Sequence, residues 1–122
     1  MSTWKSDIDL SCLLIAGNCQ AVEFSLYGVT LIFLTGLKLQ IYSSSEIKRP
    51  DGKIWRWEER HLIDIAGFGE LLGYSISRYR IIPGDRLSIA FGNGYELEIR
   101  DDSEEFPETL IIRPPDGGPI IL

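Results

Sequence analysis

One segment, residues 86–101, restricts the possible folds more than any other part of this 122-residue chain. Its two halves alternate apolar and polar residues, and Asn93-Gly94 lies between them. Successive side chains of a β-strand point to opposite sides, so each half would have one apolar face. Asn-Gly accepts the positive φ angles of a type I′ turn and is the strongest short signal for a hairpin. The segment therefore predicts an antiparallel β-hairpin with one apolar face and one polar, largely charged face.

A second segment shows the same pattern 58 positions earlier. Residues 31–41 match residues 89–99, with Phe, Gly and Ile identical at three positions. Farther upstream, Leu14-Ile15-Ala16-Gly17 is similar to Leu71-Leu72-Gly73. Any two amphipathic hairpins resemble each other, but the shared register favours an internal duplication, with repeat-like halves at about 10–42 and 70–101. We therefore expect two similar β-units, packed face to face or laid edge to edge in one sheet.

A helix is expected between these two units. In residues 61–72, Leu62, Ile65, Phe68 and Leu72 recur at spacings of three and four, and Gly73 would terminate the helix. We predict a single domain, residues 1–122, that is α+β and mainly β, with antiparallel hairpins in two related β-units and one short helix between them. Further strands are expected at 20–26, 54–58, 74–82, 109–113 and 120–122.

The negative charge of the chain is concentrated in its last third. The net charge is −6, and residues 1–83 contain nine acidic and nine basic residues, which cancel. Residues 84–122 contain nine acidic residues and three arginines. This balance argues against nucleic acid as a partner, because phosphates attract positive charge, and it favours a basic protein partner. Five carboxylates follow one another without any base, at Asp101, Asp102, Glu104, Glu105 and Glu108.

Residues 46–60 are rich in charged and aromatic side chains and contain the turn sequence Pro50-Asp51-Gly52. Alternation places Trp55 and Trp57 on one face of a strand, with Arg56 and Glu58 on the other. One interpretation is that the tryptophans cover the edge of the core. The other is that they are anchors of a binding surface, because Trp and Arg are enriched among interface hot spots.

The chain has no motif that specifies an enzyme. GxSxG, a P-loop, HExxH and GxGxxG are all absent. His61 could act as a general base, but a lone histidine beside Glu59 and Arg60 is typical of a surface or capping residue. The acidic segment lacks the ligand spacing of an EF-hand. We therefore predict no catalytic residue, no metal site and no cofactor.

The cysteines and the apolar runs indicate the compartment. Cys12 and Cys19 are seven positions apart, which fits neither a CxxC redox pair nor half of a zinc site, so we expect reduced, structural thiols. No apolar run approaches the roughly 18 residues of a transmembrane helix, and residues 1–17 make a poor signal peptide. We expect a cytoplasmic protein that does not bind membranes.

The order of motifs in the second half is similar to that of a known group of proteins. Leu71-Leu72-Gly73 precedes a strand, a hairpin of pattern LxIxFxNGxxLxI, the acidic segment, a further strand and Pro115-Asp116-Gly117-Gly118. This order resembles small bacterial domains, some of which are immunity proteins of contact-dependent and polymorphic toxin systems. The resemblance covers residues 71–122 best. It implies an inhibitor that binds a toxin, and it implies no catalytic residues.

These observations together favour a cytoplasmic protein-binding protein, of the immunity type, that neutralises a cognate toxin (for example a nuclease domain) by covering a basic surface. The carboxylates of 101–108 would meet basic groups, with Trp55 or Trp57 as apolar anchors. An alternative is a small-molecule-binding or enzymatic domain with a pocket near His61, Arg78 and Arg80, in which the two arginines share a strand face with Ile76 and Ile82. A further alternative is a structural module that assembles through the edge of its terminal strand.

Overall fold

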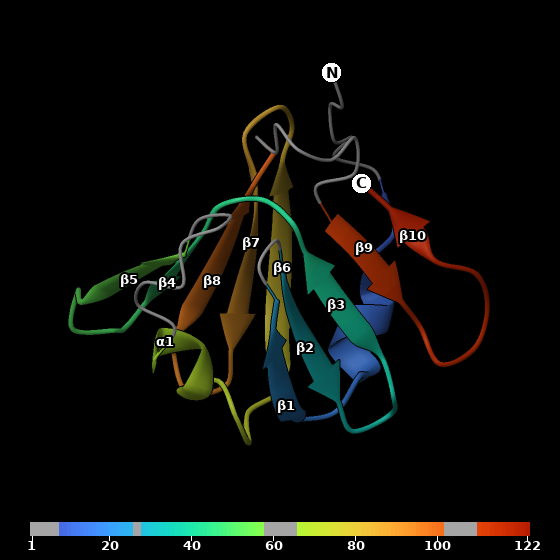
Figure 1. Ribbon diagram of the computed structural model, residues 1–122, viewed down its shortest axis with the longest axis horizontal. Helices are drawn as coiled ribbons and strands as arrows, with labels where there is room; N and C mark the ends of the chain where they lie inside the picture. The colour runs from blue at the N-terminus through green and yellow to red at the C-terminus, as the bar shows by residue number, and fades with distance from the viewer. Residues whose placement is uncertain (1–7, 26–27, 58–65, 102–109) are drawn as a thin grey trace.

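Two antiparallel sheets of five strands each form the protein in the computed structural model, which describes residues 8–25, 28–57, 66–101 and 110–122 (Figure 1). The first sheet has the order β1-β2-β3-β9-β10, and the second has the order β5-β4-β8-β7-β6. Their strands are β1 (Cys19–Phe24), β2 (Val29–Phe33), β3 (Lys38–Ile41), β4 (Ser45–Lys48), β5 (Ile54–Trp57), β6 (Ile76–Ile82), β7 (Arg86–Phe91), β8 (Glu96–Arg100), β9 (Leu110–Arg113) and β10 (Ile120–Ile121). This arrangement confirms the predicted fold class.

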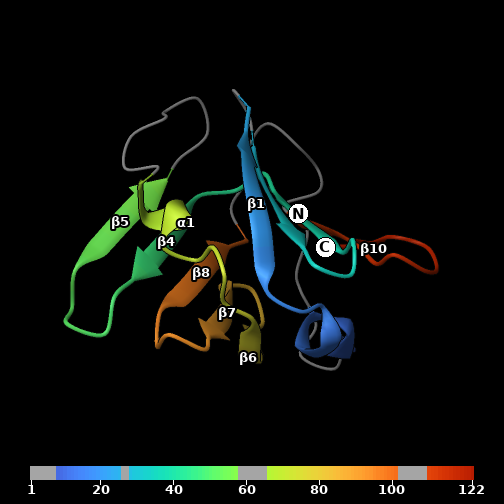
Figure 2. The ribbon, with the colours of Figure 1, turned by 90° about the horizontal axis from the view of Figure 1, so that it is seen from below.

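Two short helical segments accompany the sheets. The 3₁₀ helix η1 (Ser11–Ile15) lies against β6, and the α-helix α1 (Ala66–Gly69) lies against β5 (Figure 2). Residues 61–65 of the predicted helix 61–72 lie outside the described residues, and in its described part, 66–72, the helix ends at Gly69. Glycine has a low helix propensity, which is consistent with an end at this position. Gly73 has a positive φ of 87°, but α1 ends before it, at Gly69, so Gly73 is not its C′ residue.

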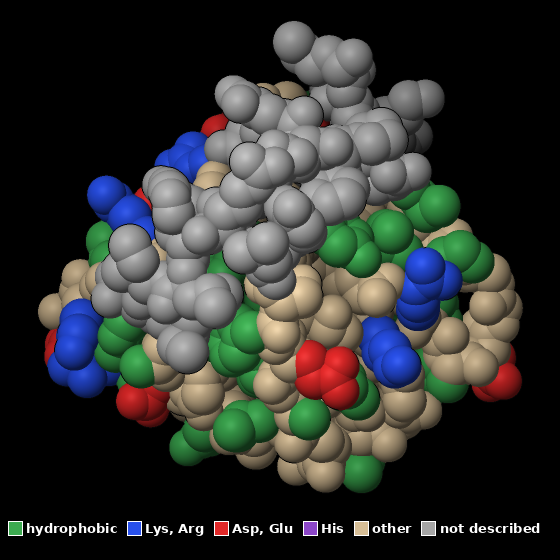
Figure 3. Space-filling model, viewed as in Figure 1, with side chains coloured by type: hydrophobic (Ala, Val, Ile, Leu, Met, Phe, Trp, Pro, Cys, Tyr) green, Lys and Arg blue, Asp and Glu red, His purple; other side chains and the backbone are tan. Residues whose placement is uncertain are grey.

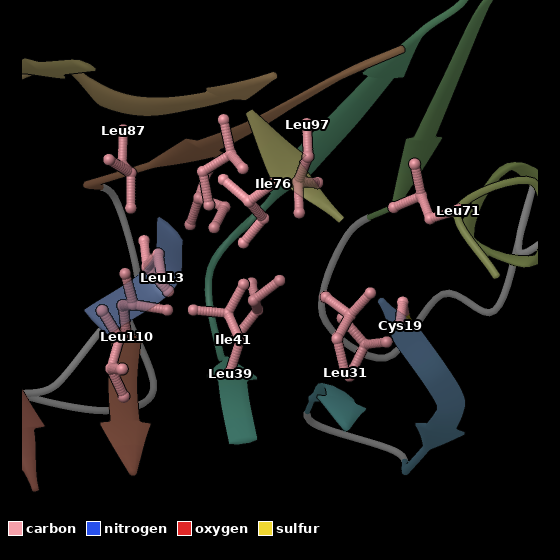
Figure 4. Close-up of a cluster of buried hydrophobic side chains, with 14 of the residues drawn as sticks. Leu13, Cys19, Leu31, Leu39, Ile41, Leu71, Ile76, Leu87, Leu97 and Leu110 are labelled. Carbon is pink, nitrogen blue, oxygen red and sulfur yellow. The ribbon is translucent and has the colours of Figure 1, made fainter. Parts of the chain in front are cut away.

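The inner faces of the two sheets meet in one hydrophobic core (Figure 4). Alternation produces it directly: Leu31 and Leu39 from the first sheet and Leu87 and Leu97 from the second are all fully buried, while their chain neighbours face outward. Each such side chain contributes about 1.5–3 kcal/mol when it is removed from water. The core therefore depends on both sheets, since each covers the apolar face of the other.

The two predicted hairpins are equivalent in structure as well as in sequence. Hairpin β2–β3 lies in the first sheet and hairpin β7–β8 lies in the second. The strand before each hairpin pairs with it in the same way, and both pairings have an irregularity at the same place, after the pairs Cys19 with Phe33 and Ile76 with Phe91. The two halves also meet at an isolated bridge between the counterparts Asn18 and Ser75. These correspondences support the internal duplication.

The two halves exchange their last hairpins. Hairpin β4–β5 follows the first unit in the chain but pairs with β8 of the second unit. Hairpin β9–β10 follows the second unit but pairs with β3 of the first. The registers correspond: Ile47 lies opposite Leu97, and its counterpart Ile112 lies opposite Leu39. Each sheet therefore consists of three strands from one half and two from the other.

The exchanged hairpins carry a second repeat that the hairpin comparison missed. Arg49-Pro50-Asp51-Gly52 and Pro114-Pro115-Asp116-Gly117 form the turns of the two hairpins, 65 positions apart. Gly52 and Gly117 have φ angles of 96° and 93°. Because this spacing differs from the 58 positions that relate the first hairpins, a comparison at one constant offset does not detect it.

The arginines of β6 point to the side of the strand opposite to the one expected, because the strand contains a bulge. Ile76 faces the core, but the register shift between Ile76 and Arg78 reverses the alternation that follows. Arg78 and Arg80 consequently lie on the outer face of the second sheet. They do not share a face with Ile76, and Tyr79 points toward the core side, where its hydroxyl accepts a hydrogen bond from the Leu10 N–H at 3.2 Å.

A substitution at Gly67 can test how α1 packs on β5. A Cβ at this position would lie 2.8 Å from Trp55 Cβ, whereas a Cβ on Gly69 would meet nothing within 4 Å. We expect Gly67→Ala to lower the free energy of unfolding by about 1–3 kcal/mol through overpacking. Gly69→Ala should be neutral or stabilising, because alanine has the higher helix propensity. Urea unfolding of both variants measures this, and equal effects would show that α1 does not pack on Trp55 in this way.

Candidate interaction surface

The outer face of the second sheet carries a lattice of charged side chains contributed by all five of its strands. Register places Arg80, Ser88, Glu98, Glu46 and Arg56 in one row across the sheet. The next row consists of Arg78, Ala90, Glu96, Lys48 and Ile54. The two rows combine residues of both halves of the chain, because β4 and β5 come from the first half.

The two glutamates at the centre of this face are opposite each other and are neutralised by neighbouring bases. Glu98 is 8% exposed. One of its oxygens lies 3.2 Å from Lys48 Nζ, and the other lies 2.7 Å from Arg86 Nε in a close charge contact that is not aligned as a hydrogen bond. Glu46 lies 3.1 Å from Arg56 and 4.0 Å from Arg100. Two like charges on adjacent strands are tolerated here because each has bases beside it.

A hollow of about 520 Å³ lies on this face between the arginines of β6 and the glutamates of β8. The small side chains Ser88 and Ala90 of β7 lie between these two strands, so the space above them is open. Arg78 and Arg80, two of the three residues of the alternative interpretation of the sequence, border this hollow, which lies on the outer face of one sheet and not between the two β-units. His61, the third residue of that interpretation, lies outside the described residues.

A smaller hollow of about 270 Å³ lies at the end of the same sheet, beside Ser45. Ser45 pairs with Trp57 of β5 on one side and with Ile99 of β8 on the other. The chain continues from β5 into residues 58–65 and from β8 into residues 102–109. Both of these segments therefore leave the second sheet at the same end. The hollow is lined by Ser44, Ser45, Glu46, Arg56, Trp57 and Arg100.

Most of the expected acidic contact residues lie outside the described part of the chain. This applies to Asp102, Glu104, Glu105 and Glu108. Asp101 is half-buried, and its N–H donates a hydrogen bond to the Asp85 carbonyl oxygen at 3.0 Å. In the view of Figure 3, the charged side chains among the coloured residues form small separate groups.

The two tryptophans belong to the core and are removed from the candidate surface. Trp57 is 1% exposed and Trp55 is 9% exposed. Trp55 stacks on Tyr95 at a centroid distance of 6.3 Å, and Lys53 Nζ lies 4.7 Å from its ring. The strand face that carries both residues is the inner face of the second sheet. Alternation identified this face, but it did not show which side was the core.

The cysteines have the properties of structural thiols. Neither Cys12 nor Cys19 forms a disulfide, and burial raises the pKa of Cys19 to about 11. A thiol with so high a pKa is a poor nucleophile at neutral pH. Within the described ranges, no group of three or more histidine, cysteine, aspartate or glutamate side chains could hold a metal ion. No helix among the described residues is long and apolar enough to cross a membrane.

The turn of hairpin β4–β5 is held by its own aspartate. Asp51 Oδ1 accepts hydrogen bonds from Arg49 Nε at 2.8 Å and from the Lys53 N–H at 3.1 Å. These hydrogen bonds, with that of Arg49 the largest, lower the pKa of Asp51 to about 2. The carboxylate therefore stays ionised and keeps the hairpin turn in shape throughout the physiological pH range.

Comparison with known proteins gives no relative: no protein-family model, curated protein or solved structure matches this chain.

Glu98 and Glu96 provide a matched pair for testing the charged lattice. Glu98 is nearly buried between two bases, whereas the side chain of Glu96 is 39% exposed and lies 3.8 Å from Arg78. We expect Glu98→Gln to lower the free energy of unfolding by about 1–3 kcal/mol, because it leaves partly buried bases without their partner. Glu96→Gln should cost about 0.5 kcal/mol or less. Chemical denaturation measures both, and a larger loss for Glu96→Gln would contradict the assignment.

Proposed function

We propose that this chain is a cytoplasmic protein-binding protein of the immunity type, which inactivates a toxin by covering a basic surface on it. The observation that carries the proposal is the distribution of charge. The residues that the structure describes contain ten acidic and ten basic side chains, and residues 1–7 contain one of each. The whole excess of six negative charges therefore belongs to residues 58–65 and 102–109.

The described residues that flank these two segments lie close together. Trp57 and Ile99 both pair with Ser45, so the chain enters each acidic segment from the same end of the second sheet. Elsewhere in the last third, Asp85, Glu96 and Glu98 have arginine or lysine partners on the sheet. The described residues are thus neutral in sum, and the net excess belongs to two segments whose flanking described residues are neighbours.

The connection that contains the more acidic segment, residues 102–109, is longer than its counterpart in the first half. In the first half, Ile41 of β3 and Ser45 of β4 are four positions apart, and the chain crosses between the sheets in that span. Their counterparts, Ile99 and Leu110, are eleven positions apart. A crossing of three intervening residues is sufficient in one half, so the additional residues of the other half are available for a different role. Four of residues 102–109 are carboxylates.

Negative charge concentrated in this way suits a cationic protein partner. It raises the rate of encounter, and its carboxylates can accept bidentate hydrogen bonds from arginine. The resemblance of residues 71–122 to immunity proteins points to the same class of partner. The proposal does not use Trp55 and Trp57, since both are buried.

The proposal is tested with the purified protein and the purified products of the genes on either side of its own. We expect one of them to bind with an affinity that falls steeply between 50 and 300 mM salt, because exposed charge pairs are screened. Replacement of Asp102, Glu104, Glu105 and Glu108 by their amides should weaken binding by about 100-fold or more. Titration calorimetry measures both effects.

A variant that removes three charges, against four in the test variant, serves as a control for net charge. Glu23→Gln, Glu70→Gln and Asp116→Asn together remove three exposed carboxylates that lie outside the two acidic segments. After correction for the effect of net charge on affinity, this variant should bind the partner with an affinity within about twofold of the wild-type value. Absence of binding to either neighbouring product, or equal weakening by the two sets of substitutions, would contradict the proposal.

A further inference from the structure

The hollow above Ser88 and Ala90 is lined by two arginines of β6 that have few partners among the described residues. Arg80 is exposed and has no ion pair or hydrogen bond to any side chain among the described residues. Arg78 is 78% exposed, and its only ion pair in the described part of the chain is with Glu96, at 3.8 Å. Both side chains alternate with Tyr79 on β6, so they lie on the same side of the strand next to the hollow.

The first sheet shows that the fold does not require these arginines. The counterparts of Arg78 and Arg80 on β1 are Ala21 and Glu23, which have the same bulge before them and the same pairing to the next strand. The counterparts of the small residues Ser88 and Ala90 are Thr30 and Ile32, which are larger. The second sheet therefore differs from the first in two coupled ways: it has two arginines at the edge strand, and it has open space beside them.

The charge of this face is not balanced. Its described strands and the β6–β7 turn carry six bases on the outer side and four acids. The bases are Lys48, Arg56, Arg78, Arg80, Arg86 and Arg100, and the acids are Glu46, Asp85, Glu96 and Glu98. The three acids other than Glu96 are shared among four bases, which leaves one surplus positive charge there. Arg78 and Arg80 exceed Glu96 by one, so the other surplus charge lies beside the hollow.

We propose that this hollow binds the phosphate group of a small molecule, with Arg78 and Arg80 as its ligands and with the Ser88 hydroxyl beneath. A phosphomonoester carries a charge of about −1.5 to −2 at pH 7, which matches the surplus of the face. The guanidinium groups present paired N–H donors that fit phosphate oxygens. The volume of about 520 Å³ lies in the usual range of small-molecule sites. None of the residues of this site belongs to the two acidic segments, and the inference does not depend on the protein-binding function proposed above.

Inorganic phosphate is the probe, added to the ¹⁵N-labelled full chain in dilute buffer and followed by NMR. We expect saturable shifts of the Arg78 and Arg80 Nε–Hε signals and of the Ser88 and Ala90 amides. Potassium chloride at the same ionic strength should not produce them. Arg80→Gln should weaken phosphate binding by about tenfold, the loss expected for a charge-assisted hydrogen bond. Identical shifts in chloride, or a response that does not saturate, would overturn the site.

The matched control is Arg113→Gln, which removes the same charge from an exposed position on the first sheet, where Arg113 Nε donates to Gln40. It should leave the phosphate affinity within about twofold, because the site is on the opposite sheet. A loss equal to that of Arg80→Gln would overturn the site in favour of a general charge effect. A second arm uses succinate, and tighter binding of succinate than of phosphate would overturn the assignment to phosphate in favour of a dicarboxylate.

Discussion

The exchange of hairpins between the two halves is the constraint on which the rest of the structure depends. Strand β4 pairs with β8 and strand β9 pairs with β3, so neither sheet is complete without a hairpin from the other half. The apolar residues of these hairpins, Ile47 and Ile112, lie opposite Leu97 and Leu39 and extend the inner face of each sheet. Folding of one half therefore stabilises the other, because the buried area of each sheet includes strands from both. The charged outer face is a consequence of the same pairing, since Lys48 of one half meets Glu98 of the other.

The near-symmetry of the halves gives an internal reference for function. Where both halves carry the same feature, such as the glycine turns at Gly52 and Gly117, the fold itself accounts for it. Where they differ, the fold does not supply the reason. The long acidic connection after β8 and the two exposed arginines of β6 are two such differences. Both proposals rest on these differences. One assigns a cationic partner to the acidic segments, and the other assigns an anionic ligand to the hollow beside β6.

The sequence predicted much of the local structure, because the strand period of two is visible in single segments. The hairpin at 86–101, its partner at 31–41 and the terminal strands follow from alternation and turn residues alone. Which strands pair with each other was harder to predict from the sequence. Nothing in β4 itself distinguishes pairing with β3 from pairing with β8, since the exchange is decided by contacts distant in sequence. The matching turns at 49–52 and 114–117 were the available signal, and the change of offset concealed it.

The candidate sites were only partly predictable for related reasons. Alternation placed Trp55 and Trp57 on one face of a strand but did not show that this face is buried, with α1 packed against Trp55. The bulge after Ile76 reversed the expected face of Arg78 and Arg80, because one inserted residue changes the side to which all later residues point. The openness above Ser88 and Ala90 depends on side chains from three strands, which single-strand patterns do not combine.

The hairpin exchange can be tested most directly with paired cysteines. Gln40 lies opposite Ile111 on the outer side of the first sheet, so Gln40→Cys with Ile111→Cys places two thiols on directly opposed residues of adjacent strands. If each hairpin instead stayed with its own half, the residue opposite Gln40 would be Glu46, the counterpart of Ile111. The account predicts an intramolecular disulfide, identified by mass spectrometry of the linked peptides, in the Gln40→Cys, Ile111→Cys variant. A disulfide in the Gln40→Cys, Glu46→Cys variant, and none in the first, would contradict it.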